Sequence, residues 1–258
     1  MDYLGQGCNN RRHHERILTG EATVNSKATF AELEDYRWLV SDEGAAWLKQ
    51  LGESQQPLIQ QAKLLRKTLT AHRTHLLLEQ VDLRIRARNK FSQADRMFFT
   101  RQSLEQATDQ WIAELKASRY SLQLPLADLC CGIGGDLLAM AHRGPTTAVD
   151  RDPVMQLLAE ANGRSLGVPD FRVEASDVES FSLDGMHAWH VDPDRRPQGR
   201  RTTRITCIEP PELVIDQLLE KCGHAAVKLA PACIAPPRWQ QRGERQWIGR
   251  RRECRQQV

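Results

Sequence analysis

The sequence predicts an α/β protein in two parts: an all-α N-terminal region, then a parallel β-sheet with helices on both faces. Three observations lead to this fold class. Between residues 38 and 120, apolar side chains recur three and four positions apart, as on the buried face of a helix. After Tyr120, short apolar runs alternate with helical stretches, which is typical of β-α-β units. The first of these runs leads into a glycine-rich turn at residues 132–135.

The N-terminal half is expected to contain a leader and a helical domain. Residues 1–35 mix Gly, Asn, Arg and His without apolar periodicity, so they predict a poorly ordered leader. Residues 36–120 predict a helical domain of four or five helices. Its longest helix is expected over roughly residues 57–90, with many Arg and Lys on a polar face that we interpret as solvated.

The C-terminal domain, residues 121–258, is expected to build the sheet. Ligands of parallel α/β sheets bind at the carboxyl ends of the strands, so this domain should carry the chemistry. The predicted strands span residues 125–131, 147–150, 171–175, 188–192 and 225–229, and the predicted helices lie near residues 136–142, 153–166 and 211–221.

Composition excludes several classes of protein. The chain has 258 residues, of which 40% are hydrophobic and 27% charged, so it is globular rather than disordered or fibrous. No apolar run approaches the ~18 residues of a membrane span, and the first 20 residues lack the apolar segment of a signal peptide. The seven cysteines are scattered without a C-x-x-C pair. We therefore expect a cytoplasmic protein with no bound metal.

Basic charge is concentrated near the C-terminus. The whole chain has a net charge of +3, but residues 195–258 hold 14 Lys and Arg against 6 Asp and Glu, a local net charge of +8. Clustered arginine is typical of proteins that bind phosphate-bearing partners. A solvated charged face explains the same pattern, and charge alone does not separate the two.

The glycine-rich turn is the most informative segment. Asp128 stands four residues before Gly132 in the pattern Asp-x-x-x-Gly-x-Gly, between an apolar run and a predicted helix. Glycines let the backbone approach a ligand, and a helix N-terminus offers unpaired N–H groups. A dinucleotide fingerprint would require glycine where the chain has Leu137, and no Gly-Lys-Ser/Thr of a P-loop follows.

The pattern resembles motif I of the class I S-adenosylmethionine-dependent methyltransferases, and further signals follow in order over about 110 residues. The resemblance implies a Rossmann-like sheet, S-adenosylmethionine as cofactor, and a ribose-binding carboxylate at Asp150, which ends the second predicted strand. It places the adenine near the residues after the third strand and the reaction centre after the fourth. The implied cofactor-binding residues are Asp128, Cys130, Gly132, Gly134, Asp150, Asp177 and Val178.

Several segments between residues 83 and 231 resemble bacterial class I methyltransferases with a THUMP-like domain, which are themselves similar to trimethylguanosine synthases. The likeness covers roughly residues 64–258. Because THUMP-type domains bind RNA, the resemblance implies an RNA partner. It also implies that the sheet lacks its seventh strand and that Val258 is a truncation, because after residue 229 only residues 246–248 offer a further strand.

Thr100 follows two phenylalanines just before the sheet domain. In several amino-directed nucleic-acid methyltransferases, a similar Phe-x-Thr turn caps a helix and lies over the cofactor. Here the likeness implies that Thr100 is a cofactor-binding residue, and Thr100 is expected to N-cap a helix bearing Leu104 and Ala107. The phenylalanines are equally explained as core between the two halves of the chain.

The predicted reaction centre is the segment Asp192-Pro193-Asp194-Arg195. In the Asp-Pro-Pro-aromatic motif of amino methyltransferases, the carboxylate holds the acceptor amine and the aromatic ring stacks on its base. Asp192 and Pro193 match this motif, whereas Arg195 stands in place of the ring, which puts a base amine acceptor in doubt. We predict catalytic roles for Asp192, Pro193 and Arg195, and substrate-binding roles for Arg196, Arg200, Arg201 and Lys228. Lys228, at the end of the fifth predicted strand, could equally pair with Asp192 or Asp194.

Two functions stay open from the sequence. One is an enzyme that transfers methyl from S-adenosylmethionine to RNA, with Asp192 orienting the acceptor. The other is a catalytically silent RNA-binding module that keeps the methyltransferase fold. A small-molecule acceptor is less compatible with the arginines that follow Pro193.

Overall fold

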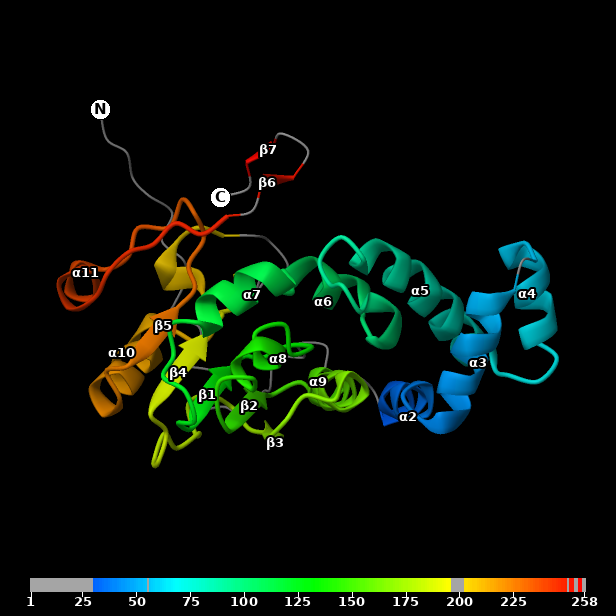
Figure 1. The fold of residues 1–258 in the computed structure, drawn as a ribbon, viewed down its shortest axis with the longest axis horizontal. Coiled ribbons are helices and arrows are strands. Elements are labelled where there is room, and N and C mark those ends of the chain that lie inside the picture. The colour runs from blue at the N-terminus through cyan, green and yellow to red at the C-terminus, as the bar shows by residue number, and fades with distance from the viewer. Residues whose placement is uncertain (1–29, 55, 196–201, 250, 253–254, 257–258) are drawn as a thin grey trace, which may run out of the picture.

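The computed structural model describes residues 30–54, 56–195, 202–249, 251–252 and 255–256. Its main sheet has five parallel strands in the order β3-β2-β1-β4-β5 (Figure 1). The order reverses at β1, so the crevice of such a sheet is expected beyond the carboxyl ends of β1 and β4. The strands are β1 (Leu126–Leu129), β2 (Thr146–Asp150), β3 (Phe171–Ala175), β4 (Ala188–Val191) and β5 (Ala225–Val227).

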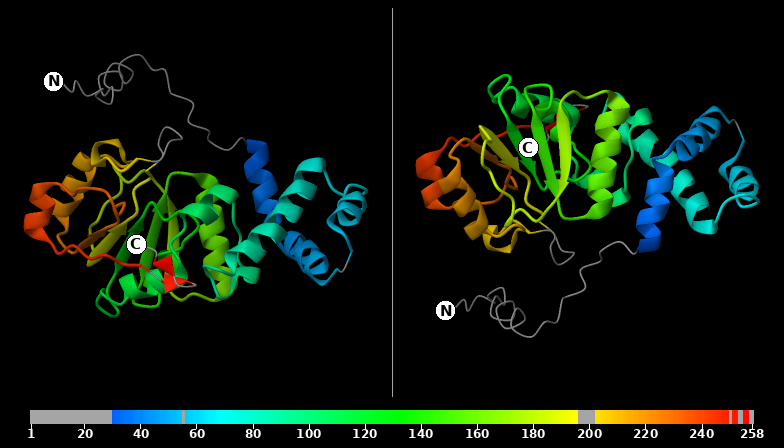
Figure 2. Two further views of the ribbon diagram at one scale, coloured as in Figure 1. Left: turned by 90° about the horizontal axis from the view of Figure 1, so that it is seen from above. Right: turned by 90° about the horizontal axis from the view of Figure 1, so that it is seen from below.

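Helices make up much of the described chain, and among the described residues six α-helices precede the sheet. The α-helices before β1 are α2 (Phe30–Leu39), α3 (Asp42–Glu53), α4 (Leu58–Leu65), α5 (Ala71–Ala87), α6 (Arg101–Gln106) and α7 (Gln110–Ala117), and a short 3-10 helix spans Ala94–Arg96. The helices after β1 are α8 (Leu137–Met140), α9 (Pro153–Leu166), α10 (Glu212–Lys221) and α11 (Pro237–Arg242), with a second 3-10 helix at Ile205–Cys207. Figure 2 shows α2 to α5 gathered at one end of the molecule, beside α9, and α10 and α11 at the other.

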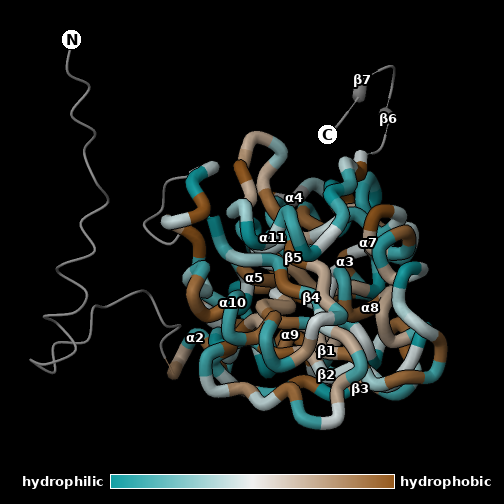
Figure 3. The backbone as a smooth tube through the Cα atoms, turned by 90° about the vertical axis from the view of Figure 1, so that its left-hand side faces the viewer, coloured by the Kyte–Doolittle hydropathy of each residue, from teal (hydrophilic) through white to brown (hydrophobic). Residues whose placement is uncertain are grey.

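Alternate residues of β1 face two different helical layers. Leu126 packs with residues of α7 and α8, whereas Leu129 packs in the cluster that contains Ile215 and Leu218 of α10. This two-sided burial explains the continuous apolar runs of the sequence, because strands covered on both faces need no polar alternation. Along the outer helices in Figure 3, hydrophobic and hydrophilic residues alternate, as expected for helices that bury one side.

Helices α2 to α5 share one hydrophobic core with the sheet domain. Leu77 and Leu83 of α5 belong to the same buried cluster as Ile133 of the glycine-rich turn and Leu158 of α9. Asn162 of α9, fully buried, accepts a hydrogen bond from the Phe98 N–H at 2.7 Å and donates to the carbonyls of Phe98 (3.1 Å) and Ile133 (3.0 Å). These hydrogen bonds join the segment after α5 to α9 and to the glycine-rich turn.

Four predictions about secondary structure differ from the structure. Among the described residues, six α-helices precede the sheet, where four or five were expected. The long helix expected over residues 57–90 is two helices, α4 and α5, because the chain turns after Leu65 and the Thr70 hydroxyl then caps α5 by accepting from the Arg73 N–H at 3.2 Å. The expected leader overlaps α2, which begins at Phe30; residues 1–29 lie outside the described residues. No strand forms at residues 246–248; the described strands β6 (Arg251–Arg252) and β7 (Arg255–Gln256) pair only with each other.

Candidate active site

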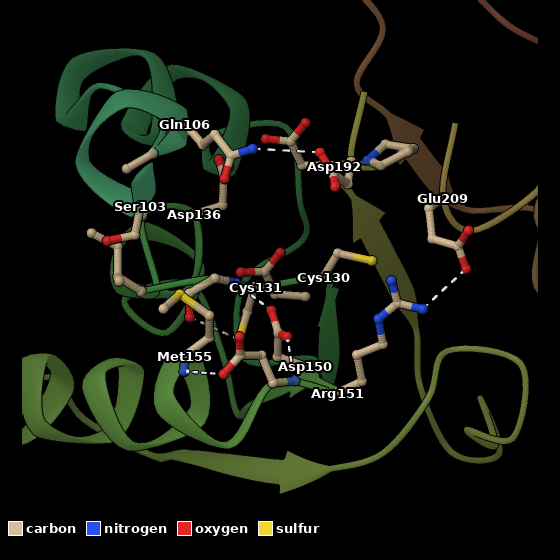
Figure 4. Close-up of a pocket in the computed structure, with 18 of the residues that line it drawn as sticks. Ser103, Gln106, Cys130, Cys131, Asp136, Asp150, Arg151, Met155, Asp192 and Glu209 are labelled. Atoms are coloured by element: carbon tan, nitrogen blue, oxygen red, sulfur yellow. Dashed lines mark hydrogen bonds and ion pairs between the residues drawn. The ribbon is translucent and has the colours of Figure 1, made fainter. Parts of the chain in front are cut away.

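A pocket of about 340 Å³ lies at the carboxyl ends of the strands, within the usual range for a small-molecule site. Residues that end or follow all five strands of the sheet line it, and the segment from α6 to residue 108 supplies one wall. Figure 4 shows its labelled side chains around a central hollow, with Asp136 and Asp192 across from Asp150 and Met155. Of the predicted site residues, the lining includes Asp128, Cys130, Gly132, Asp150, Asp177, Val178, Asp192, Pro193, Arg195 and Lys228.

The turn after β1 brings the backbone to the pocket. Cys130 and Gly132 both have left-handed backbone conformations, with φ angles of 60° and 54°. Glycine adopts this conformation without strain, as Gly132 does here. Gly134, with φ 87°, is not among the pocket-lining residues: a Cβ there would stand 3.3 Å from the side chain of Leu137 and 3.6 Å from Ala159. Its role in the structure is the close packing of the turn against α9.

Asp150, the last residue of β2, braces the same turn. Its Oδ2 accepts a hydrogen bond from the Gly132 N–H at 2.8 Å, and its Oδ1 accepts from the Asp152 N–H at 3.0 Å. Burial raises the pKa of the Asp150 carboxyl above its usual value, although these two hydrogen bonds oppose the shift. Each oxygen keeps a further lone pair, so the carboxylate can accept additional donors from a ligand.

The residues after β3 form the neighbouring edge of the pocket. Asp177 and Val178 both line it, and Val178 is buried in the core under β1. The Asp177 Oδ1 accepts from the Glu179 N–H at 3.1 Å, which holds the turn in place. This edge therefore offers one apolar and one carboxylate side chain to a ligand.

Asp192 lines the pocket and forms an ion pair with Lys228, the residue that follows β5. The sequence left Lys228 with either Asp192 or Asp194 as its partner, and the structure pairs it with Asp192. The Lys228 Nζ also donates to the Thr108 Oγ1 at 3.2 Å. Burial opposes the charge of Lys228, but Asp192 and Asp136 together raise its pKa above the usual value, so it is a cation at neutral pH.

A buried polar network continues from this ion pair into the protein. The Thr108 hydroxyl donates to the Asp136 Oδ2 at 2.6 Å, and the Lys116 Nζ pairs with the Asp136 Oδ1 at 2.5 Å. Lys116 also lies 3.1 Å from the His190 Nε2, and the His190 Nδ1 lies 2.9 Å from the Asp128 Oδ1. This geometry fits a neutral His190 that donates from Nδ1 to Asp128 and accepts from Lys116 at Nε2.

Sequence reasoning missed most of this network. His190 is 1% exposed, and its polarity within an otherwise apolar strand is a signal for a buried partner. Asp136 directly follows the glycine-rich turn. No pattern assigned a role to Thr108 or Lys116, which come from α7 and the residues before it.

The mouth of the pocket is bridged by side chains from distant segments. Gln106 of α6 donates to the Asp194 Oδ1 at 3.4 Å, and the Arg151 Nη1 pairs with the Glu209 Oε1 at 3.1 Å. Arg195 also lines the pocket. The other predicted substrate-binding arginines, Arg196, Arg200 and Arg201, lie outside the described residues.

Thr100 caps a helix without lining the pocket. Its side chain accepts from the Ser103 N–H at 3.0 Å, and Ser103 reciprocates in a capping box that starts α6, as expected for a helix that bears Leu104; Ala107 is the C-cap. Phe98 and Phe99 are buried in the shared core. Thr100 therefore acts in the structure through α6, whose Ser103 and Gln106 reach the pocket.

Acidic side chains dominate the pocket. Its described lining holds three basic residues, Arg151, Arg195 and Lys228, and nine carboxylates: Glu105, Asp128, Asp136, Asp150, Asp152, Asp177, Asp192, Asp194 and Glu209. Burial raises the pKa of Asp128, and among the described residues no donor reaches its buried Oδ2. The same residues contain no group of three or more His, Cys, Asp and Glu placed to hold a metal ion. Such a pocket favours a ligand with positive charge over one with phosphates.

Comparison with known proteins gives one partial family match. Residues 32–87 match the model of a domain of unknown function, DUF8688. No curated protein matches the chain. Within the described part of the chain, no helix is long and apolar enough to cross a membrane.

Solved structures show the likeness in fold. The chain is similar to a protein described as a putative methyltransferase from Porphyromonas gingivalis W83, with a TM-score of 0.61 and 21% identity over 78% of this chain and 49% of that one. It thus spans about half the length of that protein. A tRNA (uracil-54, C5)-methyltransferase from Pyrococcus abyssi matches with a TM-score of 0.32 and 22% identity, over 39% of this chain and 25% of that one. At this identity the first likeness shows the fold alone: the chain has the Rossmann-like α/β fold of class I methyltransferases, preceded by a helical region.

Proposed function

We propose that this protein is a cytoplasmic S-adenosylmethionine-dependent methyltransferase that acts on RNA. The observation that carries the proposal is the pocket lined by nine carboxylates at the carboxyl edge of a methyltransferase-type sheet. S-Adenosylmethionine has a sulfonium and an ammonium group and no phosphate, whereas nucleotide cofactors such as NAD or ATP bring phosphates that these carboxylates would repel.

The residues present fit this cofactor. Asp150 would accept the ribose hydroxyls, and Asp177 and Val178 would hold the adenine. The buried Asp128 Oδ2 lacks a donor among the described residues, and the cofactor's ammonium group would supply one. Cys130 and Gly132 would approach the ligand through their backbone, whereas Gly134 and Thr100 would support the site from behind.

Asp192 is proposed to orient the acceptor. When bound, the cofactor supplies an electrophilic methyl group, so the protein mainly has to hold an acceptor lone pair in line with it, at about 3 Å. Asp192 lies across the pocket from Asp150, at the end opposite the proposed ribose contact (Figure 4), and Pro193 also lines the pocket.

The proposal of an RNA partner rests on the basic C-terminal part of the sequence and on the resemblance to THUMP-containing methyltransferases. Arg195 lines the mouth, and the sequence continues with Arg196, Arg200 and Arg201. Because the pocket itself is acidic, we place the RNA phosphates on these arginines and only the acceptor nucleotide inside.

Two measurements test the proposal. Calorimetric titration with S-adenosylhomocysteine tests the cofactor, and transfer of tritiated methyl from S-adenosylmethionine to in vitro transcribed tRNA and rRNA tests the reaction. We expect binding and transfer by the wild type, and binding without transfer by Asp192→Asn. Binding of cofactor and RNA without any transfer by the wild type would favour the silent RNA-binding module, and absence of cofactor binding would overturn the proposed function.

A further inference from the structure

The proposed acceptor end of the pocket holds a fixed positive charge. The Lys228 ammonium pairs with the Asp192 Oδ2 and donates to the Thr108 hydroxyl, while its side chain keeps 29% of its surface exposed. Because this ammonium lies beside the carboxylate proposed to orient the acceptor, it stabilises negative charge that develops on the acceptor atom and destabilises positive charge there.

The network behind Lys228 holds it in place. Thr108 cannot turn away without breaking its 2.6 Å hydrogen bond to Asp136, and Asp136 is in turn paired with Lys116. Gly135 brings Thr108 close, since a Cβ at that glycine would stand 3.2 Å from the Thr108 backbone N and O. Lys228 is therefore preorganised, which is the condition under which a fixed charge contributes most to a reaction.

A fixed cation distinguishes between acceptor chemistries. An amine that attacks a methyl group develops positive charge, which an adjacent ammonium opposes. A hydroxyl that attacks while losing its proton develops negative charge on oxygen, which an adjacent ammonium stabilises. Lys228 also neutralises Asp192, so the carboxylate no longer offers a net negative charge to a developing cation.

The pocket wall is consistent with the same distinction. None of the described residues that line the pocket is aromatic. A base presented for methylation of its amine needs a stacking surface, which is commonly an aromatic ring and less often an arginine plane; in the described lining such a plane could come only from Arg151 or Arg195. A sugar hydroxyl needs hydrogen-bond partners and no ring.

From the Lys228–Asp192 pair and the absence of a ring in the described lining, we propose that the acceptor is a hydroxyl group, the 2′-hydroxyl of an RNA ribose. The proposal rests on the proposed function above and specifies its acceptor atom. The 2′-oxygen forms a bond to the methyl carbon while the carbon–sulfur bond breaks and its electron pair stays on sulfur. The hydroxyl proton passes to the Asp192 carboxylate and then to water as product leaves.

Alkaline hydrolysis of the labelled RNA tests the acceptor atom. Alkali cleaves RNA through the free 2′-hydroxyl, so a 2′-O-methyl group protects its own linkage. After transfer of tritiated methyl to in vitro transcribed tRNA and rRNA by the full chain, we expect the label in alkali-resistant dinucleotides. Label in mononucleotides would place the methyl on a base, overturning the hydroxyl acceptor while the proposed function stands. No label in any RNA would overturn both.

Substitution of Lys228 tests the role of the cation, because a hydroxyl acceptor predicts a slower methyl transfer and an amine acceptor predicts an unchanged or faster one. Lys228→Met should lower transfer by about 100-fold, the loss typical for removal of one preorganised group that stabilises an oxyanion. Affinity for S-adenosylhomocysteine should stay within about threefold, since this contact serves the acceptor. Lys228→Arg, which keeps the charge, should recover part of the rate. An unchanged or faster Lys228→Met enzyme would contradict a developing oxyanion and would support an amine.

Discussion

Replacement of Asp150 by asparagine separates the proposed ribose contact from the structural role of the same side chain. The two carboxylate oxygens accept from the backbone N–H groups of Gly132 and Asp152, at 2.8 and 3.0 Å. An asparagine has nearly the same shape but only one acceptor oxygen, so its NH₂ group must face one of these donors. Asp150→Asn therefore loses the negative charge, one backbone hydrogen bond and one acceptor for the ribose.

The size of the effect follows from these losses. A hydrogen bond to a charged group contributes about 1.5 to 3 kcal/mol, and about 1.4 kcal/mol corresponds to a tenfold change in affinity. We expect affinity for S-adenosylhomocysteine to fall about ten- to hundredfold. The lost backbone hydrogen bond should lower the free energy of unfolding by about 1 to 3 kcal/mol.

Titration calorimetry measures the first quantity and urea unfolding the second. Asp184→Asn is a matched control, because Asp184 is exposed in the loop before β4, away from the pocket. We expect that variant to match the wild type in both measurements. A folded Asp150→Asn protein that binds the cofactor as well as the wild type would refute the assignment of Asp150 to the ribose.

Three further predictions follow. Thr108→Val removes the hydroxyl that joins Lys228 to Asp136; it should lower kcat about tenfold or more with little change in cofactor affinity, and Thr108→Ser should restore the rate, whereas equal loss in both variants would indicate a packing effect. Because burial raises the pKa of Asp150 and the proposed ribose contact uses its ionised form, cofactor affinity should fall as the pH drops through that raised pKa, and calorimetry of Asp150→Asn should lack this step. Asn162→Ala removes the hydrogen-bond partner of three buried backbone groups, so it should lower the free energy of unfolding, measured in urea, by about 3 kcal/mol or more. The control Glu160→Ala, a surface change on the same helix, should lower it by less than about 0.5 kcal/mol. A loss below about 1 kcal/mol in Asn162→Ala would show that water replaces the Asn162 side chain.

The sequence by itself determined the elements whose signals are local. Helix α9 was predicted with its observed bounds because Asp152 caps its start, Pro153 occupies its first turn and Gly167, at φ 68°, ends it. Strand β3 also has its predicted bounds. By contrast, apolar spacing continued across the turn between α4 and α5, so periodicity alone did not locate the break.

The sequence also located most of the pocket, because the carboxyl ends of parallel strands meet at one edge of a sheet. Asp150, Asp177, Asp192 and Lys228 are far apart in the chain, yet each follows or ends a predicted strand, and all four line the pocket. The predicted strand ends and the glycine spacing were enough to place these residues at one edge without any knowledge of side-chain contacts.

Only the tertiary structure decided which charges are paired and which residues stand behind them. Lys228 had two acidic candidates within reach of its strand end, and the choice of Asp192 depends on side-chain geometry. Thr108 and Lys116 come from the helical region, and no local pattern indicates that a helix before the sheet will pack over Asp136. Local spacing specifies secondary structure and strand ends, whereas a buried network depends on how distant elements pack, because each of its members is stabilised only by partners far away in the chain.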